Sequence, residues 1–133
     1  MKRAAAPLLA VFWLACWGLV GQALAQGEPV VRGGVVTYPS FDVNIDDSGG
    51  LGRLRLGFEV LFTDELGAKA AATLQVRESI LLFLRGKTAA ALLAPKGRDQ
   101  LRAQLLAHIN AAIGSPKAVK LFYLDYIVVK GTP

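Results

Sequence analysis

Hydrophobic and polar residues alternate most regularly between Arg53 and Asp64. The large hydrophobic members of this segment are Leu54, Leu56, Phe58, Val60 and Phe62. Because successive side chains of a strand point to opposite faces, these five residues share one face, while Arg53, Arg55 and Glu59 share the other. The pattern predicts a strand with helices on its hydrophobic face and water on its charged face.

An earlier segment, Val35 to Ile45, also favours extended backbone because it is rich in valine and aromatic residues. Pro39 cannot donate a ladder hydrogen bond, which indicates either an edge position or a bulge. The sequence Asp-Asp-Ser-Gly-Gly at 46–50 is typical of a turn, and its two glycines can adopt positive φ. The short turn predicts that the two strands pair antiparallel.

The segment Val76–Thr88 contains the most continuous hydrophobic run of the folded part. Its centre, Ile80–Leu84, has no polar residue, and four charged residues bracket it: Arg77, Glu78, Arg85 and Lys87. Strong helix formers dominate this run. We therefore predict a core helix that packs on the sheet and has no side facing water. The helical block begins at Lys69 and ends at Arg85, with Gly86 just past its end.

Two further helices are predicted after this block. Thr88 is placed to cap a short helix at 89–93, which Pro95 and Gly97 end. A longer helix covers 98–113 and stops at Gly114. Its hydrophobic stripe consists of Leu101, Leu105, Ile109 and either Ala112 or Ile113.

The last segment, Val119–Val129, is predicted to be a strand with two hydrophobic faces. Simple alternation places Val119, Leu121, Tyr123 and Ile127 on one face and Phe122, Leu124, Tyr126 and Val128 on the other. This favours either a central strand covered on both sides or a strand with one side available to a partner. Asp125 interrupts the run, so its carboxylate must be hydrogen-bonded or reach the rim. The predicted fold is a two-layer α+β domain with the order β-β-α-α-α-β.

The amino end has the pattern of an export signal. Lys2 and Arg3 precede a largely apolar, uncharged stretch at 4–21, and Ala23-Leu24-Ala25 follows. We expect a signal peptide at 1–25 that is cleaved after Ala25. The alternative is an uncleaved membrane anchor, because the apolar stretch is just long enough to span a bilayer. A short flexible tether at 26–36 then precedes a single exported domain at 37–133.

The charged residues and the single cysteine exclude several classes of function. The formal net charge of the chain is +5, but its charges are interspersed, with no run of basic residues and no interleaved aromatic residues. Nucleic-acid binding is therefore not expected. The only cysteine, Cys16, lies in the leader, where its context argues against a lipoprotein site. The folded part therefore has no intramolecular disulfide, thiolate nucleophile or cysteine metal site.

Four candidate sites for chemistry are weak. His108 is the only histidine and lies beside the hydrophobic stripe of its helix. Asp46 and Asp47 offer too few ligands for a calcium loop. Asp42 and Asp125 could act as paired acids only if the strands brought them together. Gly86-Lys87-Thr88 lacks the upstream glycine and the helix start of a phosphate loop. We predict no catalytic, cofactor-binding or metal-binding residue.

Several short motifs occur in the order in which the FliL family of flagellar basal-body-associated proteins has them. The segment 41–45 (Phe-x-Val-Asn-Ile) resembles the opening strand of that family, and 76–80 (Val-Arg-Glu-Ser-Ile) is similar to its helix start. The segments 92–97 and 101–110 resemble the next block, and 119–128 resembles the closing strand. The similarity extends from Tyr38 to Lys130. The motif residues, with expected structural roles, are Phe41, Asn44, Arg77, Ile80 and Asp125.

The resemblance implies a stomatin-like (SPFH) periplasmic domain held at the bacterial inner membrane beside the flagellar motor. Such a protein is expected to form a homo-oligomeric ring that braces the stator units, so that they transmit torque for motility and chemotaxis. It implies no enzyme activity, no cofactor and no small-molecule substrate. The chain departs from the family in its signal-like leader and short tether, where members usually have a clear transmembrane helix and a longer linker.

Two other functions are compatible with the residues. A periplasmic adaptor of the same stomatin-like fold could organise a membrane complex unrelated to the flagellum. A small hydrolase or ligand-binding enzyme would need a deep pocket lined by Asp42, Asp125 and His108.

Overall fold

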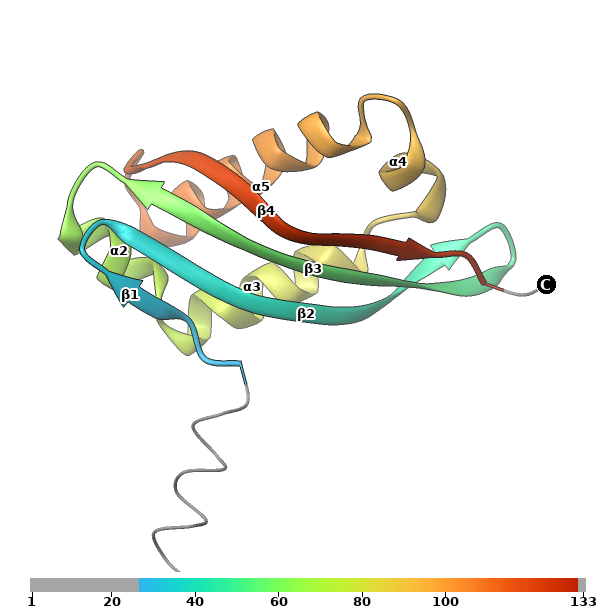
Figure 1. Ribbon diagram of the computed structural model, residues 1–133, viewed down its shortest axis with the longest axis horizontal. Coiled ribbons are helices and arrows are strands. Elements are labelled where there is room, and N and C mark those ends of the chain that lie inside the picture. Colours follow the sequence, from blue (N-terminus) through green and yellow to red (C-terminus); the bar gives the residue numbers. More distant parts are fainter. Residues whose placement is uncertain (1–26, 132–133) are drawn as a thin grey trace, which may run out of the picture.

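The computed structural model describes residues 27–131, which fold into a four-stranded antiparallel sheet with helices packed on one face (Figure 1). In chain order the elements are β1 (Val30–Arg32), β2 (Val35–Asp47), β3 (Gly50–Phe62), α2 (Glu65–Ala71), α3 (Leu74–Arg85), α4 (Ala89–Leu93), α5 (Gly97–Ile113) and β4 (Ala118–Val129). The strands lie in the order β1-β2-β3-β4 across the sheet. The predicted two-layer α+β architecture is confirmed, with one strand and one helix more in the described part than expected.

The hairpin of β2 and β3 forms the centre of the sheet. Asp47 pairs with Gly50, so the loop contains two residues, and both have positive φ: 41° at Ser48 and 92° at Gly49. This geometry matches the right-handed twist of the paired strands. The sequence pattern predicted positive φ at the two glycines, Gly49 and Gly50, whereas the structure has it at Ser48 and Gly49. Of the two alternatives at Pro39, an edge position or a bulge, the bulge is observed, since the register shifts between Tyr38 and Phe41.

The residues Val30–Arg32 form β1, although the sequence pattern placed them in a flexible tether. They pair antiparallel with the start of β2, where Val31 lies opposite Val36. Gly33 has a φ of 61°, which a tight turn between the two strands requires. The tether prediction failed here because three residues are too few to show a strand period.

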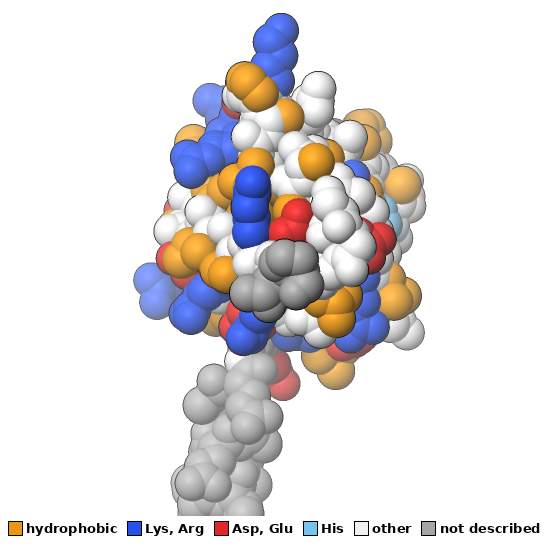
Figure 2. All heavy atoms as spheres, turned by 90° about the vertical axis from the view of Figure 1, so that its right-hand side faces the viewer, with side chains coloured by type: hydrophobic (Ala, Val, Ile, Leu, Met, Phe, Trp, Pro, Cys, Tyr) orange, Lys and Arg blue, Asp and Glu red, His pale blue; other side chains and the backbone are white. Residues whose placement is uncertain are grey.

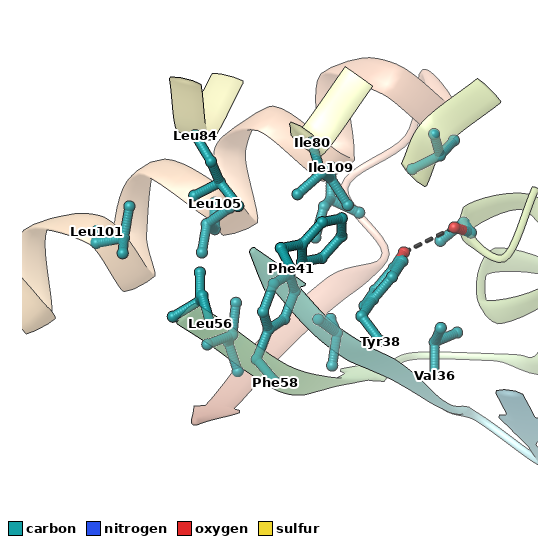
Figure 3. Packing of buried hydrophobic residues seen from close by; sticks show 14 of the residues in the cluster. Val36, Tyr38, Phe41, Leu56, Phe58, Ile80, Leu84, Leu101, Leu105 and Ile109 are labelled. Atoms are coloured by element: carbon teal, nitrogen blue, oxygen red, sulfur yellow. Dashed lines mark hydrogen bonds between the residues drawn. The ribbon is translucent and has the colours of Figure 1, made fainter. Parts of the chain in front are cut away.

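The hydrophobic core fills the space between the sheet and the helices (Figure 3). All five alternating residues of β3 are buried, as predicted from their period. They meet the predicted stripe of α5, of which Leu101, Leu105 and Ile109 are buried and Ala112 is exposed. Tyr38 also lies in the core, and its hydroxyl donates to the carbonyl of Ala71 at 2.7 Å. Burial raises the pKa of Tyr38 far above its ordinary value.

The helical block begins earlier than predicted and is interrupted. Asp64, which the sequence pattern placed at the end of the second strand, caps α2, because its Oδ1 accepts from the Gly67 amide at 2.7 Å. Thr73 then caps α3 by accepting from the Val76 amide at 3.3 Å. These two side chains supply acceptors for first-turn amide groups, which lack partners within their own helix.

The core helix α3 is confirmed, but the expectation that it is buried on all sides is wrong. Ile80 and Leu84 are fully buried, whereas Leu82 is 64% exposed. The helix lies on the surface of a two-layer domain, so one of its sides has no second layer to cover it. An apolar residue is therefore presented to solvent at Leu82.

The loop between α4 and α5 also differs from the prediction. Thr88 caps α4 as expected, accepting from the Ala91 amide at 3.2 Å. Gly97 does not break a helix but begins α5. A Cβ atom at Gly97 would lie 2.5 Å from the carbonyl oxygen of Ala91, so glycine allows the close approach of α4 and α5. Gly114 ends α5 with a φ of 72°, as predicted.

Stability at low pH is expected to depend on Asp64. The Gly67 amide, and then the Lys117 ammonium group, hold the pKa of this carboxyl below its ordinary value of 3.8. A carboxyl with a lowered pKa stabilises the fold above its unfolded pKa, and this contribution is lost as pH falls through the folded pKa. Asp64→Asn keeps the oxygen that caps α2 but does not titrate.

We therefore expect the wild type to lose more stability than Asp64→Asn between about pH 5 and pH 2. Urea unfolding at a series of pH values, followed by far-UV circular dichroism, measures this difference. Parallel loss in both proteins would show that Asp64 is not responsible.

Candidate functional site

The last strand, β4, differs most from its prediction. It is an edge strand beside β3 and not a central strand. Two register shifts, between Gly57 and Phe58 and between Leu61 and Phe62, insert extra residues into β4. These bulges change the face of the residues that follow them. Simple alternation therefore placed Tyr123 and Ile127 together, although Tyr123 lies opposite buried Phe58 and Ile127 lies opposite exposed Arg55.

The bulged strand presents a row of hydrophobic side chains on the outer face of the sheet. We call the following residues the outer row: Phe122 (53% exposed), Leu124 (55%), Ile127 (49%) and Val129 (54%). The helices cover the opposite face of the sheet (Figure 1). A group of exposed apolar side chains on one strand is typical of an interaction surface. The alternative of one side available to a partner therefore fits β4.

Charged side chains lie beside the outer row. Arg55 pairs across the sheet with Ile127, and its Nε lies 3.9 Å from Asp125 Oδ2. Arg53 Nη2 lies 3.5 Å from Asp42 Oδ1. Both pairs are well exposed, so each contributes little to stability. These two ion pairs place charged groups next to the outer row.

The carboxylate of Asp125 is hydrogen-bonded, as expected for an acid within a hydrophobic strand. The hydroxyl of Ser40 donates to its Oδ2 at 2.7 Å, and the carboxylate also reaches the rim near Arg55. Ser40 lies in the bulge of β2, which brings its side chain toward β4. The contact therefore links the two strands that flank β3.

Replacing Asp125 with alanine removes the acceptor of the Ser40 hydroxyl. We expect Asp125→Ala to lower the free energy of unfolding by about 1 kcal/mol, because a bond to a charged acceptor is lost at a half-buried site. A double-mutant cycle with Ser40→Ala isolates this contact in urea unfolding. Additive effects of the two substitutions would contradict the assigned pairing.

The five predicted motif residues do not converge on one site. Phe41 and Ile80 are buried in the same core cluster, and the Arg77 guanidinium lies 5.2 Å from the centre of the Phe41 ring. Arg77 Nε also donates to the Gly27 carbonyl at 3.1 Å. Asn44 is exposed on β2, on the same face of the sheet as Asp125. Their standing as family-motif residues stays a prediction, and their contacts are those of residues that hold the fold.

The candidate sites for chemistry are dispersed. His108 Nε2 lies 2.6 Å from Ser79 Oγ, and its ring stacks on Phe83 at 4.9 Å, so it links α5 to α3. Asp47 Oδ2 accepts from the Gly131 amide at 2.8 Å. Asp42 and Asp125 contact different arginines. Within residues 27–131, no group of three or more His, Cys, Asp or Glu side chains is arranged to hold a metal ion.

A second exposed apolar surface lies in the helical layer. It is an open groove of about 690 Å³ between α3 and α5, which we call the helix groove. Its residues include Leu74 (61% exposed), Leu82, Phe83 and His108. Beside it, burial lowers the pKa of Lys87, whose ammonium lies 4.3 Å from the centre of the Phe83 ring. Sequence reasoning missed this groove because it assigned Leu82 to the core.

The contacts of β4 with α4 and α5 were also missed. The Tyr123 hydroxyl donates to the carbonyl of Arg98 at 2.6 Å, and the Tyr126 hydroxyl donates to the carbonyl of Leu92 at 2.7 Å. Desolvation raises the pKa of Tyr123 to about 12, and burial raises that of Tyr126, so both hydroxyls stay neutral donors. Asn110 bonds both backbone groups of Ala118. Asparagine in the last turn of a helix was the available signal for such a contact.

The comparisons with known proteins are consistent with these landmarks. A search of the helices between residues 27 and 131 finds none that is long and apolar enough to cross a membrane. The leader proposed at 1–25 lies outside the described residues. No curated protein sequence matches the chain significantly. The family model described as "Flagellar basal body-associated protein FliL" matches residues 35–129, from the start of β2 to the end of β4. The chain thus belongs to the FliL family of flagellar basal-body-associated proteins.

Proposed function

We propose that this protein is a non-enzymatic scaffold that stabilises stator units of the flagellar motor at the periplasmic side of the inner membrane. Membership of a basal-body-associated family supports the location at the flagellum. The observation that carries the scaffold role is the outer row, because a domain that exposes four large apolar side chains on one strand can gain free energy by covering them.

The proposed assembly is a ring of identical copies. The domain exposes apolar surface on two opposite layers: the outer row on the sheet and the helix groove between α3 and α5. If the outer row of one copy packs against the helix groove of the next, every contact is head-to-tail. A head-to-tail contact closes into a ring when its rotation divides a full turn. The ring would surround or brace a stator unit and keep it engaged under load.

Mixing two variants distinguishes this contact from a symmetric one. Phe122→Asp/Ile127→Asp damages the outer row, and Leu74→Asp/Leu82→Asp damages the helix groove. Each variant alone is expected to be monomeric in mild detergent, whereas an equimolar mixture is expected to form heterodimers, because one intact row can meet one intact groove. Analytical ultracentrifugation measures the outcome. A mixture that stays monomeric would contradict the head-to-tail contact.

The location depends on the leader at 1–25. Cleavage after Ala25 gives a periplasmic protein that its neighbours hold at the membrane, and retention gives an anchored one. In both cases the basic residues before the apolar stretch favour export of the folded domain. The mature protein is expected to begin at Gln26, which intact-mass analysis measures.

A pull-down of the tagged protein in a gentle detergent, from flagellated cells, tests the proposed function. We expect stator and basal-body proteins in the eluate, and the mass of the bait decides whether the leader is retained. An eluate without motor components, together with normal swimming of a deletion strain, would favour a periplasmic adaptor of another membrane complex.

A further inference from the structure

The free edge of β4 is a second feature of this strand, distinct from its outer row. The sheet ends on one side with β1, which has three residues, and on the other with β4, which has twelve. Among residues 27–131, β4 pairs with β3 and has no strand on its other side. A long exposed edge presents a series of backbone donors and acceptors to any extended chain.

Among residues 27–131, a side chain bonds to the β4 backbone only at Ala118, the first residue of the strand. Asn110 Oδ1 accepts from the Ala118 amide at 2.8 Å, and Asn110 Nδ2 donates to the Ala118 carbonyl at 3.2 Å. The side-chain amide thus takes the place of a paired strand at that position. Within the described part of the chain, no further side chain bonds to the β4 backbone, so the edge is open from Lys120 to Val129.

The border of this edge is basic and partly apolar. The guanidinium groups of Arg98 and Arg102, one turn apart on α5, lie 4.7 Å and 5.2 Å from the ring centres of Tyr126 and Tyr123 on β4. An open groove of about 380 Å³ lies beside them, lined by Arg102, Leu106, Val119, Lys120, Leu121 and Phe122. Figure 2 shows the end of the domain that lies on the right of Figure 1, where basic side chains are interspersed with hydrophobic ones.

The charges beside the β4 edge determine which kind of extended segment can bind there. Asp99 pairs with Arg102 at 2.8 Å, but Arg98 and Lys120 have no ion pair within residues 27–131. Lys130 follows the strand and adds a further positive charge. Two β4 edges placed side by side would bring these cations together, which disfavours a second copy. An acidic segment meets the cations with opposite charge.

We propose that the free edge of β4, from Lys120 to Val129, binds an extended acidic peptide segment of a partner protein by strand addition. Backbone hydrogen bonds to β4 hold the segment, and its acidic side chains meet Arg98, Arg102 and Lys120. The proposal does not depend on ring formation, because the outer row lies on the face of the sheet and the binding site lies at its edge.

Blocked nine-residue peptides test the proposal against the full-length chain in a mild detergent. The acidic probe alternates valine with glutamate. One twin carries N-methyl groups on the amides of one strand edge, and another carries lysine in place of glutamate. Fluorescence anisotropy measures affinity, and hydrogen–deuterium exchange measures protection of β4. We expect saturable binding of the acidic probe, protection within 120–129, and at least about tenfold weaker binding of both twins.

Charge reversal at the border provides an internal control for folding. The variant Arg98→Glu/Lys120→Glu is expected to lose affinity for the acidic probe and to gain affinity for the lysine twin. An unfolded variant would not show this reversed selectivity. If the N-methylated twin binds as tightly as the acidic probe, binding does not occur by strand addition. If the acidic probe shows no saturable binding, the β4 edge is not a binding site for it. Protection of β4 that rises with protein concentration alone would show that a second copy occupies the edge, which also overturns the proposal.

Discussion

Replacing Phe58 with alanine is expected to lower the free energy of unfolding by about 3–5 kcal/mol. Phe58 is fully buried on β3, and its ring lies 5.0 Å from that of Tyr38 and 5.9 Å from that of Phe41. The substitution removes apolar contact on both sides and leaves a cavity between the sheet and the helices (Figure 3). Because domains of this size are stable by only about 5–15 kcal/mol, the loss is a large share of the total.

Urea unfolding followed by far-UV circular dichroism measures this effect, since Trp13 and Trp17 both lie in the leader. Phe122→Ala is the matched control, because the same side chain is removed from the outer row of β4. It is expected to change stability by less than about 0.5 kcal/mol. Similar losses in the two variants would mean that the assignment of inner and outer faces is wrong.

The second large effect is expected on association rather than on folding. Phe122→Asp/Ile127→Asp places two carboxylates in the outer row, where burial against another copy would desolvate them. We expect self-association to weaken at least about tenfold while the unfolding midpoint changes little. Sedimentation of the full-length chain over a range of concentrations in mild detergent measures the change.

Leu66→Asp is the control for this prediction. Leu66 is 73% exposed on α2 and belongs neither to the outer row nor to the helix groove. Its substitution adds the same charge without touching either proposed surface, so association is expected to stay at the wild-type level. Equal weakening by Leu66→Asp would show that general charge repulsion, and not the outer row, determines association.

The elements that could be predicted are those whose signals are local. The period of two in β3 identified the buried residues of its inner face. Thr88 marked a helix start through its side-chain cap, and Gly114 marked a helix end through its positive φ. The helix α3 was also identified, since it is rich in helix formers. Its exposure at Leu82 was not predicted, because exposure depends on how many layers cover the helix.

The candidate site depends on relations that are not local. Alternation along β4 assumes one residue per position, whereas the two bulges depend on the register against β3. The edge position of β4 depends on the strand order of the whole sheet. The sequence therefore left two alternatives for this strand, a central position or one side available to a partner, and did not identify the residues of the outer row. Asn110 in the last turn of its helix signalled a side-chain contact, but its partner, the Ala118 backbone, depends on where β4 lies.

The number of stator units held at each motor tests the central claim most directly. Fluorescently tagged stator units can be counted in a deletion strain that carries the wild-type chain, Phe122→Asp/Ile127→Asp, Leu66→Asp or no copy. We predict that motors under load lose stator units in the deletion strain and in the outer-row variant, and keep them with Leu66→Asp. An unchanged number of stator units in the deletion strain would contradict the account.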